Sequence, residues 1–208
     1  MTHFLFTVGF LTCSFIWGGI PTGYIVVKLL KGIDIRNHGS GNIGAANVRR
    51  VLGTPWFFGV LMLDAFKGAL PMLLALLIFE FAALEEVIVA ASVIGGSLFS
   101  PWLRFKGGKG IGTSLGVLFV LAPIPVLVSV AMFVIILFMF NYVSIASISS
   151  AIVFPIAIFV AESIRGIQHD TILLVFAILL ACALVAMHRV NISKVANGTE
   201  HRFFVRKK

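Results

Sequence analysis

Charge is scarce in this chain, and so are the features of an ordinary soluble protein. Only 12% of its 208 residues are Asp, Glu, Lys or Arg, whereas 60% are hydrophobic. Soluble domains usually carry about 25% charged and about 45–50% apolar residues. The sequence also lacks a linker, a low-complexity tract and a convincing internal repeat. We therefore expect an all-α, polytopic membrane protein that forms a single domain over residues 1–208.

The sequence also lacks the common metal and nucleophile motifs. It has no HExxH, no Cys/His spacing typical of a metal site, no acidic cluster and no GxSxG elbow. None of its histidines precedes an aspartate by four residues, which excludes a His/Asp base pair of that kind. Cys13 and Cys182 lie within apolar segments, and we expect small buried residues rather than a disulfide. No metal and no cofactor are expected.

Basic residues outnumber acidic ones by 16 to 8. Such a balance can indicate nucleic-acid binding, but these Lys and Arg residues lie between apolar spans, which is typical of cytoplasmic loops. Loops 28–50, 104–109 and 188–208 are therefore expected to face the cytoplasm. Loop 80–86 carries three glutamates (one of them Glu80) but no Lys or Arg, and is expected on the other side. No nucleic-acid partner is expected.

Long apolar segments predict the spanning helices. The apolar run 111–140 is interrupted by Pro123 and Pro125, which predicts two helices, the first of them short. Because both ends of 110–187 lie on the cytoplasmic side, four crossings fit this part. The sequence thus predicts a seven-transmembrane-helix bundle with its N-terminus outside and its C-terminus cytoplasmic. The other spans are expected at 4–27, 56–79, 87–103, 148–164 and 171–187.

The polar stretch HGSGNIGAANVRR, which begins at His38, interrupts this apolar chain. Its glycines free the backbone so that amides can turn toward one anion. Ser40, Asn42 and Asn47 add neutral donors, and two adjacent arginines at 49 and 50 add planar cations that suit phosphate. The letters GSGNIG match a dinucleotide fingerprint, but no βαβ unit surrounds them. The stretch predicts a phosphate-binding loop.

A second glycine-rich stretch, KGGKG, contains Lys106 and Lys109. It looks like a P-loop, but no lysine stands in the required register. Ordinary cytoplasmic loop charge is one explanation for these lysines, and anion binding is the other. Gly107 and Gly108 favour binding, because loop topology has no use for glycines that weaken the start of a following helix.

Polar residues inside or beside other spans have two explanations each. Asp64 and Lys67 are three residues apart in the second span, so they can form an ion pair. That pair is either structural or a support for a nearby site. His188 is either an interfacial side chain or part of a hydrogen-bonding cluster with Asn191 and Glu200.

The predicted orientation brings the polar motifs to one membrane face. Ser144 and Ser147 lie in a polar junction expected at 141–147, and the basic tail begins at 188. Both should meet the two glycine-rich loops at the cytoplasmic surface.

Three blocks, at 40–50, 105–110 and 188–200, together resemble the acyl-phosphate-dependent glycerol-3-phosphate acyltransferase (PlsY) family of bacterial membrane enzymes. LDAFKG at 63–68 and YVSIAS at 142–147 are similar to that family as well. The resemblance implies transfer of a fatty acyl group from acyl phosphate to the 1-hydroxyl of glycerol 3-phosphate, which gives lysophosphatidic acid and phosphate. It also implies a bacterial inner-membrane enzyme with a cytoplasmic active site, in contact with membrane lipids and with the enzyme that makes acyl phosphate.

The resemblance and the loop chemistry give two groups of site residues. The predicted catalytic residues are Ser40, Arg50 (rather than Arg49), Lys109, His188, Asn191 and Glu200. The predicted substrate-binding residues are Gly41, Asn42, Gly44, Asn47, Lys106, Gly107, Gly108, Ser144 and Ser147. The chain departs from the family pattern at Ala46, where threonine is usual, at Gly96, where histidine is common, and at Asn141, which lacks a nearby basic residue.

Two other functions use the same features. An anion channel or phosphate-coupled transporter would place glycines and cations at a break in the middle of the membrane. An inactive lipid-binding paralogue would keep the loops without turnover. Because the polar blocks lie at span ends, the sequence favours an interfacial enzyme.

Overall fold

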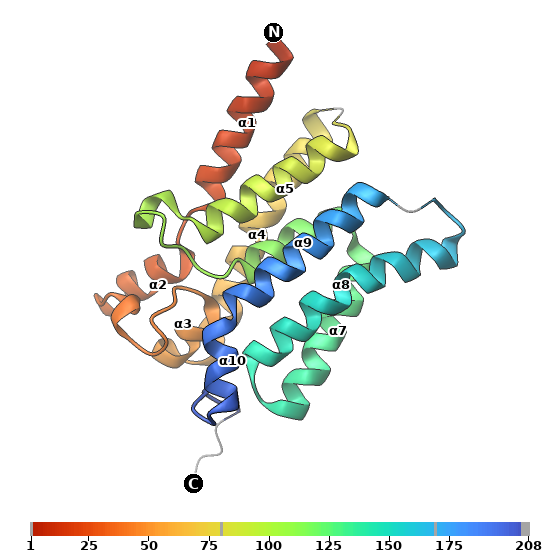
Figure 1. The fold of residues 1–208 in the computed structure, drawn as a ribbon. Coiled ribbons are helices and arrows are strands. Elements are labelled where there is room, and N and C mark those ends of the chain that lie inside the picture. Colours follow the sequence, from red (N-terminus) through yellow and green to blue (C-terminus); the bar gives the residue numbers. More distant parts are fainter. Residues whose placement is uncertain (1, 80, 169, 205–208) are drawn as a thin grey trace. The chain divides into compact units, whose positions relative to one another are not determined.

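The computed structural model describes residues 2–79, 81–168 and 170–204, with side chains from Phe4 onward. Every regular element in these residues is a helix, as predicted. The chain forms two compact units, residues 1–121 and 122–208, and each is described by itself (Figure 1). Glu80 and the final residues 205–208, which the sequence places in an outer turn and the basic tail, lie outside the described part.

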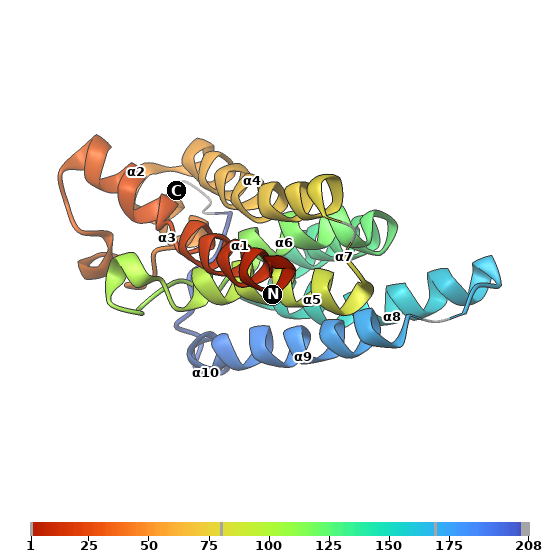
Figure 2. The ribbon, with the colours of Figure 1, turned by 90° about the horizontal axis from the view of Figure 1, so that it is seen from above.

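The first unit packs α1 along α5 and α4 along α6 (Figure 1, Figure 2). Its helices are α1 (Thr2–Gly18), α2 (Thr22–Lys31), α3 (Ala45–Leu52), α4 (Thr54–Ile78), α5 (Ala83–Leu98) and α6 (Ile111–Leu121), with short 3-10 turns η1 (Ile35–Asn37) and η2 (Pro101–Leu103). Together α1 and α2 form one apolar segment of 28 residues, which is interrupted at 19–21.

Glycines allow these helices to approach very closely. A Cβ on Gly68 of α4 would overlap the Thr113 carbonyl oxygen of α6, and a Cβ on Gly116 of α6 would overlap the Ala65 carbonyl oxygen of α4. In membrane proteins, where lipid is as apolar as a side chain, such small residues let helices gain packing contacts. The close helix pairs therefore depend on these glycines.

Gly96 is another packing position. A Cβ there would overlap the carbonyl oxygen of Phe15 on α1. The histidine that the family commonly has at this position has no room in this chain, because α1 lies directly against α5. Gly96 is thus part of the contact between two helices and not a lost site residue.

The Asp64–Lys67 ion pair of α4 contacts the backbone where α1 and α2 are interrupted and holds that backbone in place. Lys67 Nζ lies 2.9 Å from Asp64 Oδ1 and donates to the Ile20 carbonyl oxygen at 2.9 Å. Thr22 Oγ1 donates to Asp64 Oδ1 at 2.5 Å. An interrupted helix leaves backbone groups without helical partners, and in lipid these must be satisfied inside the protein. Of the two explanations left open by the sequence, these contacts favour the structural one.

The second unit consists of α7 (Pro123–Phe140), α8 (Val143–Arg165), α9 (Thr171–Met187) and α10 (Arg189–Ala196). Helix α8 packs against both α7 and α9 (Figure 1). The predicted break before Pro123 is confirmed, with both early prolines in the first turn of α7, where a missing N–H has little cost. Helix α8 begins five residues earlier than the predicted 148, so Ser144 and Ser147 lie on a helix and not in a loop.

Within the residues that the structure describes, the long apolar helices overlap the predicted spans. Five are long and apolar enough to cross a membrane, and α9 with α10 forms a sixth that is bent by 53°. Helix α6 has 11 residues, about 16 Å at ~1.5 Å per residue, against a hydrocarbon core of ~30 Å.

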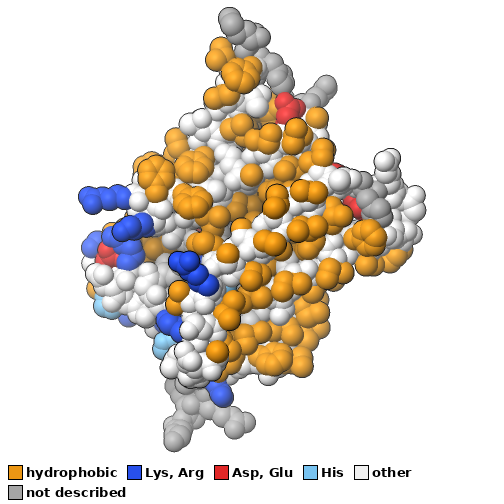
Figure 3. Space-filling model, viewed as in Figure 1, with side chains coloured by type: hydrophobic (Ala, Val, Ile, Leu, Met, Phe, Trp, Pro, Cys, Tyr) orange, Lys and Arg blue, Asp and Glu red, His pale blue; other side chains and the backbone are white. Residues whose placement is uncertain are grey.

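Apolar side chains cover much of the visible surface (Figure 3). Cys13 and Cys182 are exposed and free, so the expectation that they are buried is wrong. In a membrane protein a small apolar side chain can face lipid as readily as the interior.

Candidate functional site

The loop between η1 and α3 is folded around one buried side chain, Asn47. Its Nδ2 donates to the carbonyl oxygens of His38 at 2.9 Å and Asn42 at 2.8 Å, and its Oδ1 accepts from the Ser40 N–H at 2.9 Å. The residue is 1% exposed. Because its amide bonds to the loop itself, we reassign Asn47 from a phosphate donor to the residue that shapes the loop.

Glycines 39 and 41 adopt the left-handed backbone that the loop requires, with φ of +61° and +75°. A Cβ on Gly39 would also overlap Asn47 Oδ1. Asn42 Oδ1 accepts from the Gly44 N–H at 2.9 Å, just before α3 begins. The N–H groups of Ser40 and Gly44 are therefore bonded within the loop.

Arg50 lies beside this loop. A Cβ on Gly39 would stand 3.4 Å from Arg50 Cδ, so the arginine stem runs along the glycine. Arg49 is half-buried, and burial, followed by the neighbouring charge of Arg50, lowers the pKa of its guanidinium. Arg50 is half-buried as well, and its contact with Gly39 places its stem beside the candidate loop.

An ion pair fixes the start of the same loop. Arg36 Nη2 donates to Asp34 Oδ2 at 2.6 Å, and the Asp34 side chain also accepts from the Arg36 N–H at 2.9 Å. These hydrogen bonds lower the pKa of Asp34 to about 2. A lowered pKa stabilises the folded state above the ordinary carboxyl pKa, and this contribution is lost as the pH falls through about 2. At neutral pH the pair is fully formed.

The second glycine-rich loop lies against the first. A Cβ on Gly108 would stand 3.4 Å from Ile43 Cγ1 and 3.9 Å from Asn42 Oδ1. Lys109 follows directly and is half-buried, whereas Lys106 is exposed. The structure therefore brings the Lys109 backbone close to the Asn42 loop.

The glycines of this second loop, which the sequence suggested for anion binding, allow the loop to lie directly against the end of α5. The Gly107 N–H donates to the Leu98 carbonyl oxygen at 3.1 Å, and the Gly108 N–H donates to that of Ser97 at 3.0 Å. A Cβ on Gly107 would overlap both carbonyls. These amides satisfy the last carbonyls of α5, which a helix end leaves unpaired. These two amides are therefore bonded to α5, and the glycines allow the loop to approach that helix.

Charge is separated along the first unit. Figure 3 shows Lys and Arg side chains gathered over α2 and α3, near the loop that follows α5. Glu85 and Glu86 lie in the first turn of α5, at its other end. The two candidate loops thus lie at the basic end of the unit.

In the second unit, Ser144 and Ser147 lie one turn apart on α8 and are both buried, at 6% and 2% exposure. Residues three apart share a helix face. The Ser144 hydroxyl has no hydrogen-bond partner among the described residues. A buried hydroxyl without a partner is costly in a folded protein and therefore calls for an explanation.

The predicted cluster in the tail is partly confirmed by contacts. Asn191 Nδ2 donates to Glu200 Oε2 at 2.7 Å, and Glu200 is 8% exposed. His188 is 3% exposed, and its Nδ1 lies 2.8 Å from the Leu184 carbonyl oxygen. Because a carbonyl only accepts, Nδ1 carries the proton, and Nε2 is the acceptor of the neutral ring.

Sequence reasoning missed the residues that hold this tail. Asn141 appears in it only as a departure from the family pattern, yet its side chain bonds to the backbone of Phe204. Two residues 63 positions apart carry no shared spacing or periodicity, so no signal in one sequence indicates this contact.

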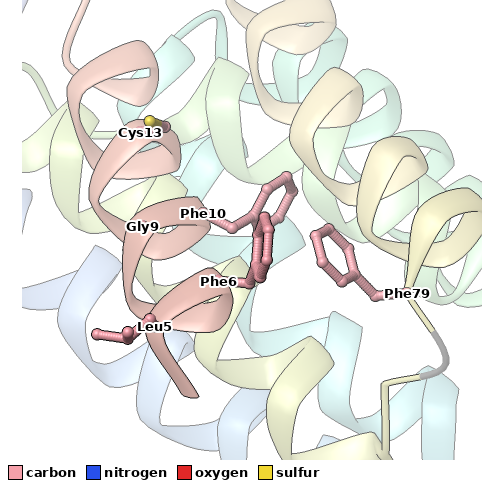
Figure 4. A pocket seen from close by; sticks show the side chains of 6 residues that line it. All are labelled: Leu5, Phe6, Gly9, Phe10, Cys13 and Phe79. Atoms are coloured by element: carbon pink, nitrogen blue, oxygen red, sulfur yellow. The ribbon is translucent and has the colours of Figure 1, made fainter. Parts of the chain in front are cut away.

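A pocket of about 410 Å³ lies within the first unit, between α1 and the end of α4 (Figure 4). Phe10 and Phe79 both line it and contact each other, with ring centroids 5.0 Å apart. Its lining is almost wholly apolar and contains no predicted site residue.

Long apolar helices, interrupted by cationic and amide-bearing loops, define a polytopic, all-α membrane protein. Within that class, the chain belongs to the glycerol-3-phosphate acyltransferase family, whose model matches residues 8–198. This confirms the resemblance found in the sequence.

Relatives and solved structures agree with this family. The chain is 38% identical to a glycerol-3-phosphate acyltransferase of Syntrophotalea carbinolica over 93% of this chain and 95% of that protein. It is 40% identical to that of Desulforudis audaxviator over 93% and 94%. The crystal structure of PlsY, an integral membrane glycerol 3-phosphate acyltransferase, in its glycerol 3-phosphate form is similar, with a TM-score of 0.87, 34% identity and coverage of 95% and 96%. The lysophosphatidic acid form of PlsY gives a TM-score of 0.84, 33% identity and 95% coverage of both chains. The chain is thus an integral membrane acyltransferase of the PlsY type.

Proposed function

We propose that this chain transfers a fatty acyl group from acyl phosphate to the 1-hydroxyl of glycerol 3-phosphate. The hydroxyl oxygen bonds to the acyl carbon, the bond from that carbon to the phosphate oxygen breaks, and the products are lysophosphatidic acid and phosphate. The glycerol 3-phosphate and lysophosphatidic acid forms of the similar PlsY structures support the acceptor and the product.

One observation carries this proposal. The loop tied by Asn47 lies against the loop of Gly108, and Arg50 runs beside Gly39. Neither stretch, 38–50 or 104–110, contains an Asp or Glu. The fixed positive charges of arginine and lysine suit phosphate groups, and both substrates are phosphorylated.

The chemistry requires charge stabilisation more than base catalysis, because phosphate is already a good leaving group. Arg50 and Lys109 stabilise the charge that develops on the departing phosphate. A phosphate oxygen accepts the hydroxyl proton. His188 is the alternative base, since the bond from its Nδ1 to the Leu184 carbonyl oxygen makes Nε2 the nitrogen of the ring that can accept a proton.

The remaining predicted residues complete the assignment, unit by unit. In the first unit, Ser40 and the loop residues at 41, 42, 44 and 106–108 belong to the substrate-binding region, with Asn47 shaping it. In the second unit, we assign substrate contacts to Ser144 and Ser147 and a supporting role to the Asn191–Glu200 pair.

The membrane topology forms part of the same proposal. Seven crossings within one membrane domain, with the N-terminus outside and the C-terminus cytoplasmic, place the basic end of the first unit at the cytoplasmic face. Figure 3 supports this with the basic side chains over α2 and α3. The enzyme then lies in the bacterial inner membrane among lipids and receives acyl phosphate from the enzyme that makes it.

The decisive test is lysophosphatidic acid production by the purified protein with acyl phosphate, acyl carrier protein thioester or coenzyme A thioester as donor. We expect product from acyl phosphate alone. Product from a thioester at an equal rate contradicts the donor assignment. Phosphate uptake by proteoliposomes without acyl transfer indicates the transporter, and no product from any donor indicates an inactive paralogue.

Asn47→Ala is expected to lower acyl transfer at least tenfold, because the loop loses its central ties and the Ser40 N–H and two carbonyls lose their partner. Limited proteolysis should cut the variant faster within 38–44. Asn37→Ala, at an exposed position in the same region, serves as the control and should match the parent. Normal rates and normal proteolysis of Asn47→Ala would show that the loop holds its shape without this residue.

Ser144→Ala is expected to raise thermal stability and lower activity together. Removing a buried hydroxyl without a partner removes its desolvation cost, ~1–3 kcal/mol, while the substrate loses a contact. Ser129→Ala, which removes a buried hydroxyl bonded to the Pro125 carbonyl oxygen at 3.0 Å, provides the comparison and should not gain stability. Unfolding temperature in detergent and initial rates measure both effects. A loss of both stability and activity in Ser144→Ala would indicate a structural role.

A further inference from the structure

We propose that Asn141 is a positioning residue, which fixes the buried carboxylate of Glu200 by clamping the backbone at 203–204. The inference rests on the proposed role of Glu200 in acyl transfer. It concerns the second unit alone.

The clamp consists of three hydrogen bonds at the junction of α7 and α8. The Phe204 N–H donates to Asn141 Oδ1 at 2.5 Å, and Asn141 Nδ2 donates to the Phe204 carbonyl oxygen at 3.0 Å. The Phe203 N–H donates to the Asn141 main-chain carbonyl oxygen at 2.8 Å. One asparagine thus holds two successive residues of the tail through both its side chain and its backbone.

Aromatic packing adds to the clamp. The Phe204 ring stacks on Phe138 of α7, with centroids 5.2 Å apart. The Phe203 side chain is 6% exposed. A tail that only trailed from α10 would have no reason to bury a phenylalanine, so these contacts indicate a docked segment.

The clamp lies four residues beyond Glu200, and a second anchor precedes it. The N–H groups of Thr199 and Glu200 donate to the Lys194 carbonyl oxygen at 2.8 and 3.1 Å, and Gly198 has a φ of +67°. This helix end reverses the chain over α10. Glu200 is therefore held between two fixed points, with its Oε2 on Asn191 at 2.7 Å.

A buried carboxylate needs such restraint. Its charge is better solvated in water, so a free tail would turn the side chain outward. Ordering the tail costs conformational entropy, which the clamp offsets with hydrogen bonds and stacking. Asn141 thus acts on Glu200 through the chain at 201–204 and without touching it.

The backbone of Asn141 supplies a clean variant. Its φ is +62° at the end of α7, a conformation that glycine adopts without strain. Asn141→Gly therefore removes the side chain clamp and keeps the turn. Asn197→Ala is the matched control, an exposed asparagine at the end of α10.

The experiment compares full-length protein, Asn141→Gly, Asn197→Ala, and chains that stop after residue 202 or after residue 204. We expect Asn141→Gly and the stop after 202 each to lower kcat by about tenfold to 10²-fold, the range that small misplacement of an active group causes. The control and the stop after 204 should keep the parental rate. Unfolding temperatures should change by less than about 2 °C.

Combining Asn141→Gly with the chain that stops after residue 202 distinguishes a positioning role from a general loss of structure. If Asn141 acts through the tail, Asn141→Gly in the chain that stops after 202 lowers kcat no further. Losses that multiply, or a parental rate in Asn141→Gly, would overturn the inference.

A spin label on His201→Cys, in a chain with Cys13 and Cys182 replaced by alanine, reports the tail directly. Its mobility should rise in Asn141→Gly and not in Asn197→Ala, and unchanged mobility also overturns the inference. This readout needs no turnover. Wild-type protein that makes no lysophosphatidic acid would therefore refute the proposed function, while the label still decides whether the clamp holds the tail.

Discussion

Arg50→Ala and Lys109→Ala are each expected to lower turnover by on the order of 10²–10³, the usual effect of losing one preorganised charge at a reacting group. Arg49→Ala is expected to keep most of the activity. The physical reason is placement, because the Arg50 stem runs along Gly39 of the candidate loop. Initial rates with acyl phosphate and glycerol 3-phosphate give kcat and KM for each variant.

Arg49→Ala is the matched control, since it removes the same side chain one residue away on the same helix. Removing a charge that acts only in the transition state should lower kcat and kcat/KM by the same factor. Three variants with comparable activity would contradict the assignment, as would a loss confined to Arg49→Ala.

Gly96→His is expected to destabilise the protein strongly. Even the Cβ of Gly96→Ala would overlap the Phe15 carbonyl oxygen, so α1 must move away from α5. Forcing atoms into packed interiors typically costs ~1–3 kcal/mol for small additions, and an imidazole requires a larger displacement. Thermal unfolding in detergent and the yield of membrane-inserted protein measure the effect.

The neighbouring Gly95 supplies the control. A Cβ there would stand 3.7 Å from the Phe15 ring, an ordinary contact. Gly95→Ala should therefore keep or slightly raise stability, because alanine favours a helix by ~1 kcal/mol over glycine. Equal behaviour of Gly95→Ala and Gly96→Ala would show that the α1–α5 contact is looser than described.

Hydropathy and proline placement predicted the long apolar helices, but not the short helices α3 and α10. The break before Pro123 and the exact range of α9 both follow from them, because lipid imposes length and polarity on each span. The early start of α8 was missed, since Ser144 and Ser147 look like loop residues until a partner surface buries them.

The sequence indicated which residues belong to the candidate loops, but not which hydrogen bonds those residues form. The sequence shows that Asn47 and Gly107 are present in glycine-rich loops, but not which acceptors or donors they use. Asn47 bonds inward to the loop backbone, and the Gly107 amide serves the end of α5. These hydrogen-bond partners depend on the tertiary structure, because a backbone amide bonds to whichever group the fold brings near it.

The Asp64–Lys67 pair has a consequence for biogenesis. The carbonyl of Ile20 and the hydroxyl of Thr22 both have hydrogen-bond partners on α4, so the N-terminal segment and α4 satisfy part of each other's polar groups inside the bilayer. A polar group costs free energy in hydrocarbon when it has no partner. We therefore expect the N-terminal segment and α4 to enter the bilayer together as a hairpin, with Lys67 and Asp64 bonded to the first segment before the later helices insert.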